Sequence, residues 1–230
     1  MYTVITKQID HIIDRIENCD VLNDPWPHMF IPEVIRPEDY RTFSEFEQAE
    51  HLTCIRDDLS EREQYSLGLD NVPEPVVRLY NKQMNKLFHT IADKFGLAKL
   101  EQEVTPTLNF WKDTDKLLID DIHIDEFHDT KLCISAMIYL PKDLEQKDYG
   151  TLLYEYSGTD LNSHAFEDPE CDIYHQSNPE HLDKWTLKRR IPFLPNCMFI
   201  TINNPNSWHQ APTNIREGDV RKSCMIRWKV

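Results

Sequence analysis

Apolar positions repeat with a helical spacing twice in the first hundred residues. The first set predicts a short amphipathic helix near the amino terminus, and its members are Ile5, Ile9, Ile12, Ile13 and Ile16. The second set predicts a longer helix, and its members are Val77, Tyr80, Met84, Leu87, Phe88, Ile91 and Phe95. Pro75 and Gly96 stand at the expected start and end of the longer helix. With a shorter helix expected from Pro37 to about Gln48, the region 1–100 is predicted to be a mainly helical supporting region.

From about residue 103 the apolar pattern becomes typical of strands. The strand candidates are 132–140, 150–156, 197–203 and 220–230, and a shorter one follows the loop at 25–28. Strands joined by turns, without long helices between them, favour an antiparallel sandwich or barrel. The segment 157–190 is long and polar, and we expect it to be an insert that covers a pocket. The sequence therefore predicts a single domain, 1–230, with a β core at 101–230 that carries this insert.

Charge narrows the range of partners. The 230 residues include 40 acidic and 25 basic ones, which gives a formal net charge of -15. Such a chain is repelled by a phosphate backbone, so nucleic acid is disfavoured as a partner. The most basic cluster is short and is expected to be a solvated helix end; it consists of Lys184, Lys188, Arg189 and Arg190. No apolar run approaches the ~18 residues of a membrane span and no signal peptide is evident, so we expect a cytoplasmic protein with no membrane partner.

One histidine and one aspartate stand out by their spacing. His123 and Asp125 are two residues apart, which places both side chains on the same face of a strand. With a second histidine they would form the 2-His-1-carboxylate arrangement that holds Fe(II) and leaves coordination positions open. His181 and Asp183 have the same spacing, but they lie in a charged stretch that is expected to be a turn followed by a helix. His123 is the stronger candidate because it follows the apolar segment 117–119, and a buried lone charge there would need a partner or a metal.

The carboxy-terminal strand has two different faces. One face is apolar and carries Val220, Cys224, Ile226 and Trp228; the other carries Arg221, Ser223, Met225 and Arg227. An arginine and a serine two residues apart can clamp a carboxylate, because the guanidinium group offers a bidentate fork and the hydroxyl a third donor. An internal ion pair of Arg221 with one of the acidic residues is the alternative. His209 follows the strand 197–203 and fits either a third metal ligand or a loop histidine.

These residues, in this order, resemble the Fe(II)/2-oxoglutarate-dependent oxygenase superfamily, and in particular its prolyl-hydroxylase-like branch. The segment 131–141, followed by Asp148-Tyr149-Gly150-Thr151-Leu152, resembles the strand and glycine-containing turn after the first metal ligands of that branch. Pro25-Trp26-Pro27-His28 resembles the entry segment of its small bacterial and viral members. The resemblance spans about residues 103–230 and this segment, and it rests on the ordered set, since no single motif is specific.

The resemblance implies a mainly β fold with supporting helices, a double-stranded β-helix (jelly roll) with an amino-terminal helical extension. The implied Fe(II) ligands are His123, Asp125 and His209. The residues implied to contact 2-oxoglutarate are Arg221, Ser223, Tyr139 and Asn109. Arg221, with Ser223, would bind the distal carboxylate. Tyr139 would reach the same carboxylate or pack as a core aromatic residue.

The implied activity is oxidation of an unactivated C–H bond by O2, with 2-oxoglutarate converted to succinate and CO2. Hydroxylation is the default outcome, and the substrate is expected to be a protein side chain, an amino acid or a small metabolite. The acidic half of the insert 157–190 would favour a neutral or cationic ligand, or merely keep that loop solvated. Two alternatives remain. Arg221 and Arg227 have the Arg-x5-Arg spacing of AlkB-like nucleic-acid demethylases, and a jelly-roll protein can bind ligands without catalysis.

Overall fold

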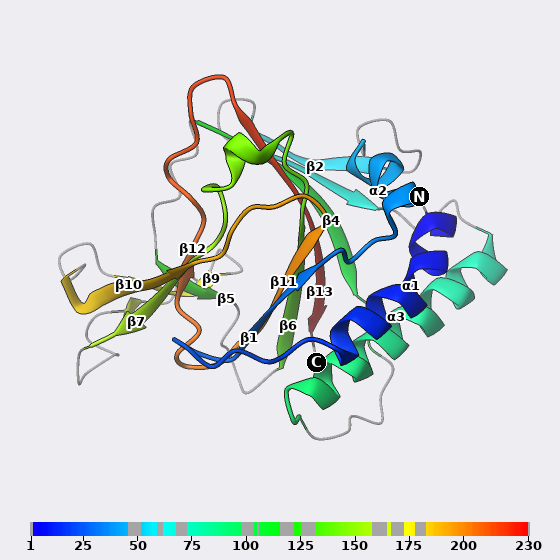
Figure 1. Ribbon diagram of the computed structural model, residues 1–230, viewed down its shortest axis with the longest axis horizontal. Coiled ribbons are helices and arrows are strands. Elements are labelled where there is room, and N and C mark those ends of the chain that lie inside the picture. The colour runs from blue at the N-terminus through cyan, green and yellow to red at the C-terminus, as the bar shows by residue number, and fades with distance from the viewer. Residues whose placement is uncertain are drawn as a thin grey trace.

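A computed structural model describes residues 2–45, 52–58, 62–67, 73–97, 104, 106–115, 122–125, 132–157, 165–166, 173–177 and 183–229. Within these residues two antiparallel β-sheets lie beside each other, and two long helices pack side by side against the outside of the larger sheet (Figure 1). The helices are α1 (Tyr2–Glu17), α2 (Pro37–Ser44), α3 (Glu74–Lys94) and the short 3-10 helix η2 (Leu144–Gln146). No helix of this described part is long and apolar enough to cross a membrane.

The larger sheet has seven strands in the order β1-β11-β6-β13-β4-β3-β2. Their bounds are β1 (His28–Pro32), β11 (Cys197–Ile202), β6 (Cys133–Tyr139), β13 (Val220–Lys229), β4 (Thr107–Thr114), β3 (Arg62–Leu67) and β2 (Leu52–Asp58). The smaller sheet has six strands in the order β10-β7-β12-β5-β9-β8. Their bounds are β10 (Trp185–Arg190), β7 (Leu152–Tyr156), β12 (His209–Gln210), β5 (His123–Asp125), β9 (Ile173–Ser177) and β8 (Ala165–Phe166).

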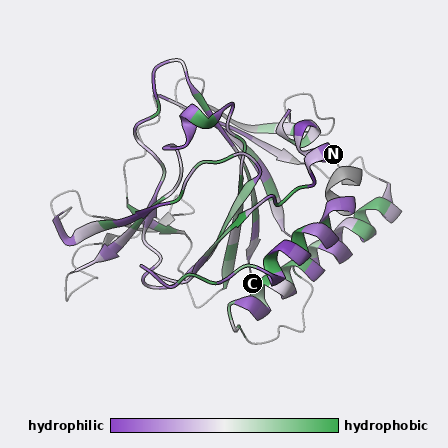
Figure 2. Cartoon of the chain, viewed as in Figure 1, coloured by the Kyte–Doolittle hydropathy of each residue, from purple (hydrophilic) through white to green (hydrophobic). Residues whose placement is uncertain are grey.

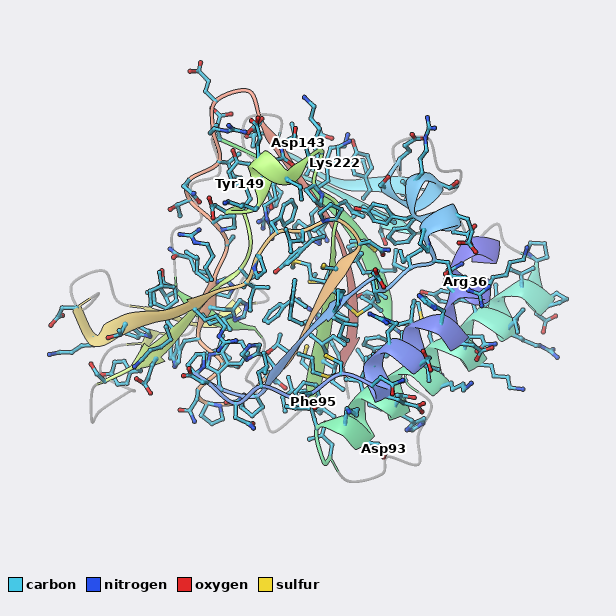
Figure 3. The ribbon with its side chains drawn as sticks, viewed as in Figure 1. Arg36, Asp93, Phe95, Asp143, Tyr149 and Lys222 are labelled. Carbon is cyan, nitrogen blue, oxygen red and sulfur yellow. The ribbon has the colours of Figure 1, made fainter. Side chains whose placement is uncertain are left out.

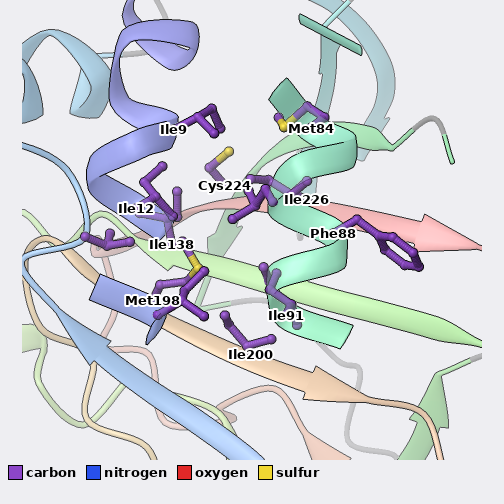
Figure 4. Packing of buried hydrophobic residues seen from close by; sticks show 14 of the residues in the cluster. Ile9, Ile12, Met84, Phe88, Ile91, Ile138, Met198, Ile200, Cys224 and Ile226 are labelled. Atoms are coloured by element: carbon purple, nitrogen blue, oxygen red, sulfur yellow. The ribbon is translucent and has the colours of Figure 1, made fainter. Parts of the chain in front are cut away.

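The helices form because their apolar stripes cover the larger sheet. Ile9, Ile12 and Ile16 of α1 and Phe88 and Ile91 of α3 are all buried in one cluster with the outer face of that sheet (Figure 4). The opposite faces of both helices are largely hydrophilic (Figure 2). Both helices predicted from the 3.6-residue period are therefore confirmed, because burial of an apolar stripe is what that period encodes.

The structure differs from the prediction in the segment 157–190. The sequence predicts a helix after 181–184, but Trp185–Arg190 forms strand β10, which pairs with β7. Trp185 is buried against the ring of Tyr156, and Lys188 forms a 2.6 Å ion pair with Glu155 on β7. Lys188, Arg189 and Arg190 thus lie on the edge strand of a sheet and not at a helix end, and the cross-strand pair of Lys188 with Glu155 supports the strand. Strands β8 and β9 also fall within this segment, and residues 178–182, including His181, lie outside the described residues.

A second difference concerns the region 1–100. Besides its helices it contributes β1 and the hairpin β2–β3 to the larger sheet. Strand β3 pairs with β4 and places Arg62 opposite Asp113. The polar sequence of this hairpin, Arg62-Glu63-Gln64-Tyr65, lacks the apolar alternation that predicts a strand. The hairpin nevertheless brings a charged side chain to the interior.

Strand β13 separates the core from the space between the sheets. Cys224, Ile226 and Trp228 belong to the cluster under the helices. Arg221 faces the other way, toward a second cluster that joins residues of both sheets, including Tyr139. The two faces predicted for this strand are confirmed, since successive side chains in a strand point to opposite sides. We call the space between the sheets the interior.

Candidate functional site

Two histidines meet at the centre of the smaller sheet. His123 on β5 lies directly opposite His209 on β12 in an antiparallel pair, and their ring centroids are 4.5 Å apart. His123 is buried, and Nδ1 of His209 lies 2.9 Å from the backbone oxygen of Ser207. A carbonyl oxygen only accepts, so Nδ1 carries a proton, and in the neutral ring this leaves the lone pair on Nε2, which is the form of imidazole that ligates metals. The two predicted histidine ligands, far apart in the sequence, are therefore brought together.

The third predicted ligand is placed only by its backbone. Asp125 ends strand β5, and the pairing of β5 with β9 shifts register between Ile124 and Asp125. The side chain of Asp125 lies outside the described residues. Among the side chains that are described, no group of three His, Cys, Asp or Glu residues is arranged to hold a metal ion. Of the three predicted metal ligands, the structure therefore describes the side chains of the two histidines only.

Arg221 is held firmly in the interior. Its Nε donates to the backbone oxygen of Tyr149 at 2.7 Å, and its Nη1 donates to Oδ2 of Asp113 at 2.6 Å. Its guanidinium group lies 5.2 Å from the centre of the Phe193 ring. Tyr149 and Lys222, the neighbour of Arg221, lie at the same end of the molecule as η2 (Figure 3). Two fixed contacts orient the guanidinium group and leave Nη2 against the sulfur of Met137, at 3.5 Å.

Asp113 is shared by two arginines. Its side chain is fully buried, and Oδ1 accepts from Nε of Arg62 at 2.6 Å while Oδ2 accepts from Arg221. The guanidinium group of Arg62 also lies 4.6 Å from the centre of the Trp111 ring. Two guanidinium groups around one carboxylate leave a formal charge of about +1, and buried charge requires compensation. The cluster therefore favours a second carboxylate, and the predicted alternative of an internal ion pair for Arg221 is present alongside it.

Two buried donors next to this cluster have no acceptor. Oγ of Ser223 and Nε1 of Trp111 are inaccessible to solvent and have no hydrogen-bond partner in the described part of the chain. The register of β13 places Ser223 opposite Trp111 on one side and opposite Tyr139 on the other. Buried polar atoms in native proteins almost always have partners. A hydroxyl two residues from Arg221 and the indole N–H of Trp111, whose ring contacts Arg62, are donors that an anionic ligand with several oxygens would satisfy.

Tyr139 is fully buried, and its hydroxyl has a partner. Its Oη lies 2.8 Å from Oγ1 of Thr151, and the Thr151 N–H donates to it at 3.3 Å. Burial raises the pKa of Tyr139, and the charge of Arg221 opposes that shift. The hydroxyl is therefore neutral, and it can donate to a ligand when Thr151 donates to it.

Asn109 lies further from Arg221 along β4. It is opposite Met225, whereas the residue opposite Arg221 is Asp113. The inner face of β4 thus carries Asn109, Trp111 and Asp113 in sequence, and the two later residues reach the arginine cluster. The alternation of residues in 107–114 indicates which side chains share a face of the strand. It does not give the register that matches Asp113 to Arg221, because that register depends on a strand far away in the sequence.

Neither a protein-family model nor a curated protein sequence matches the chain. Solved structures do match in fold. One is the non-heme alpha ketoglutarate dependent carbocyclase SnoK from nogalamycin biosynthesis, with 12% identity over 95% of this chain and 83% of that chain and a TM-score of 0.51. Another is a prolyl hydroxylase from Trichoplax adhaerens, in complex with a hypoxia inducible factor peptide fragment, with 10% identity over 97% and 89% of the two chains and a TM-score of 0.50.

These likenesses establish the fold of the chain. It is a double-stranded β-helix with helices packed on its outside. The fold class predicted from the sequence is confirmed, including the likeness to a prolyl hydroxylase.

Proposed function

We propose that this protein is an Fe(II)- and 2-oxoglutarate-dependent dioxygenase. Its substrate would be a protein side chain, an amino acid or a small metabolite with an unactivated C–H bond. The observation that carries the proposal is the buried guanidinium group of Arg221, which lies on neighbouring strands with the unpartnered donors of Ser223 and Trp111. We call these three residues the candidate anion site. This site and the pair His123–His209 belong to facing sheets of one double-stranded β-helix.

The residues present fit both implied groups. The Nδ1 atom of His209 is held by the backbone oxygen of Ser207, which leaves Nε2 as the nitrogen that would bind a metal. His123 lies beside it, and Asp125 would supply the carboxylate, so these three would hold Fe(II). Arg221, Ser223 and Trp111 would bind the distal carboxylate of 2-oxoglutarate. When bound, Fe(II) with 2-oxoglutarate and O2 supplies the oxidising chemistry, and succinate and CO2 are released.

The protein's own contribution is to orient these groups and exclude water. Asp113 and the backbone oxygen of Tyr149 fix Arg221, so the guanidinium group does not reorganise when the carboxylate arrives. Phe193, Phe199 and Leu153 are buried in the interior cluster. They would keep the site dry, which strengthens each hydrogen bond to the cosubstrate.

The test is anaerobic addition of Fe(II) and then 2-oxoglutarate to the apoprotein, monitored by the weak visible charge-transfer band of the chelate. We expect a band in the wild type that is lost in His123→Ala and needs at least about tenfold more 2-oxoglutarate in Arg221→Ala, because a charge-assisted hydrogen bond is lost. His11→Ala is the matched control, since His11 is on the outer helix α1. A folded wild-type protein that gives no band at saturating cosubstrate would refute the proposal and favour a non-catalytic binding protein.

A further inference from the structure

Six more polar atoms are buried without partners among the described residues, and two of them belong to neighbouring side chains at a different part of the interior. They are Nε1 of Trp26 and Nε2 of His28, and neither has a hydrogen-bond partner within the residues the structure describes. His28 is 0% exposed and Trp26 is 2% exposed. Neither atom belongs to the anion site around Arg221.

His28 faces the interior because of its position on β1. It lies opposite Thr201 of β11, while the next residue, Met29, packs in the cluster under the helices. Its ring lies 5.9 Å from the ring of Phe199, which is part of the interior cluster. The alternation of the strand therefore turns the imidazole toward the space between the sheets.

The protonation of His28 follows from the contact of its ring with the backbone. Nδ1 lies 2.7 Å from the backbone oxygen of Trp26, so Nδ1 carries the proton and Nε2 is an acceptor. Burial lowers the pKa of His28, which keeps the imidazole neutral. Trp26 supplies the complementary donor, since an indole nitrogen only donates.

Trp26 connects this pair to the candidate metal ligands. Its ring lies 5.5 Å from the ring of His28 and 6.5 Å from the ring of His209, and the tilted rings of His209 and His123 are 4.5 Å apart. The ring of Trp26 is thus adjacent both to His28 and to His209, a candidate metal ligand. A substrate must present its reacting carbon in that neighbourhood.

We propose that Trp26 and His28 form a substrate subsite for a neutral group that accepts one hydrogen bond and donates another, namely a hydroxyl or a carboxamide. A carboxylate would place its oxygens against the lone pair of His28. An ammonium group would satisfy His28 but direct its protons at the indole N–H. The inference rests on the proposed function, because it treats the interior as the place where a substrate binds.

The experiment uses four small probes of matched size: propionamide, 1-propanol, propionate and 1-propylamine. Their binding to the metal-free protein is measured by saturation-transfer NMR and titration at neutral pH. We expect propionamide and 1-propanol to bind, and the two charged probes to bind more weakly. His28→Phe, which keeps an aromatic ring but removes the acceptor, should weaken propionamide binding about tenfold, the loss expected for one buried hydrogen bond.

Trp26→Phe removes the donor in the same way and serves as a second variant if His28→Phe does not fold. His11→Phe is the matched control and should leave all four affinities unchanged, since His11 lies on α1 and its Nε2 contacts the backbone oxygen of Glu33. Equal binding of all four probes, no binding of any, or unchanged binding in the folded variants would overturn the inference. The chelate band of the wild type is read separately, so a missing band with selective probe binding would reject the oxygenase and keep the subsite.

Discussion

Ser223 carries a hydroxyl group that has no partner among the described residues. A buried hydroxyl without a partner costs stability, so its removal should not weaken the fold. For Ser223→Ala we expect an unfolding free energy that is unchanged or higher by up to about 1 kcal/mol, together with about tenfold weaker binding of 2-oxoglutarate. Chemical denaturation and titration of the chelate band measure the two effects.

Ser135 provides the control for that variant. It is also a buried serine on the inner face of the larger sheet, but its Oγ accepts from Nε of Arg227 at 3.3 Å. Ser135→Ala should therefore destabilise the fold by about 1 kcal/mol and leave cosubstrate affinity unchanged. If Ser223→Ala behaves like Ser135→Ala in both measurements, Ser223 is structural and takes no part in the anion site.

Gly150 has no space for a side chain. A Cβ atom there would lie 1.6 Å from the backbone oxygen of Ile191 and 3.2 Å from the backbone nitrogen of Phe193. Gly150→Ala should cost about 3 kcal/mol or more, because backbone atoms must move. It should also weaken cosubstrate binding, since the flanking residues Tyr149 and Thr151 hold Arg221 and Tyr139.

Gly96 gives the comparison for Gly150. It follows α3 with a φ of 68°, and a Cβ atom at this position would have no other atom within 4 Å. Gly96→Ala should cost only about 1 kcal/mol, for the left-handed backbone alone, and leave cosubstrate binding intact. Thermal or denaturant unfolding of both variants measures the two losses of stability. Equal losses would contradict this account.

At the scale of elements, helix α3 supports the sheet without touching the site. Phe88 is fully buried and its ring lies 6.2 Å from that of Trp228 on the outer face of β13. Phe88→Ala should lower the unfolding free energy by about 3–5 kcal/mol, whereas Lys82→Ala on the exposed face of α3 should change it by less than about 0.5 kcal/mol. Cosubstrate affinity of folded Phe88→Ala should stay near that of the wild type. A large loss of affinity would mean that the helix positions Arg221 through β13.

Elements with strong apolar periods are predictable from the sequence, and elements without them are not. The stripe of α3 and the two faces of β13 follow directly from the sequence, because the apolar positions of each pattern are the positions that become buried. Strand β10 resembles a helix end in sequence because its buried residue, Trp185, is followed by exposed and charged ones. Cross-strand pairing decides whether such a segment forms a strand or a helix, and the pairing partners cannot be identified from the local sequence.

The candidate site shows the same limit. The order of His123, His209 and Arg221 indicates the chemistry, and the register of β5 with β12 brings the two histidines together. Asp113 and Arg62 were not predicted, because their roles depend on how three distant strands align. To predict that Asp113 contacts Arg221, one needs the register between β13 and β4, which the sequence alone does not give.

At the scale of the whole molecule, the net charge opposes the proposed cosubstrate. The chain carries a formal charge of -15, and 2-oxoglutarate is a dianion at neutral pH. Salt screens charges separated by more than about 10 Å at 0.1 M but has little effect on a buried pair. We therefore expect 2-oxoglutarate to bind more tightly as ionic strength rises from a low value to about 0.15 M, as titration of the chelate band would measure. Affinity that falls with salt would show that the local positive cluster dominates the field instead.

The short strands of the smaller sheet give the proposed metal a second role. Strand β12 has two residues and β5 has three, and within the described residues they pair only at His209 and His123. An ion bound by both histidines would cross-link these segments, and any ligand that binds only the folded state stabilises it. In a cell, iron supply would then govern how long the protein survives proteases, as well as how fast it works.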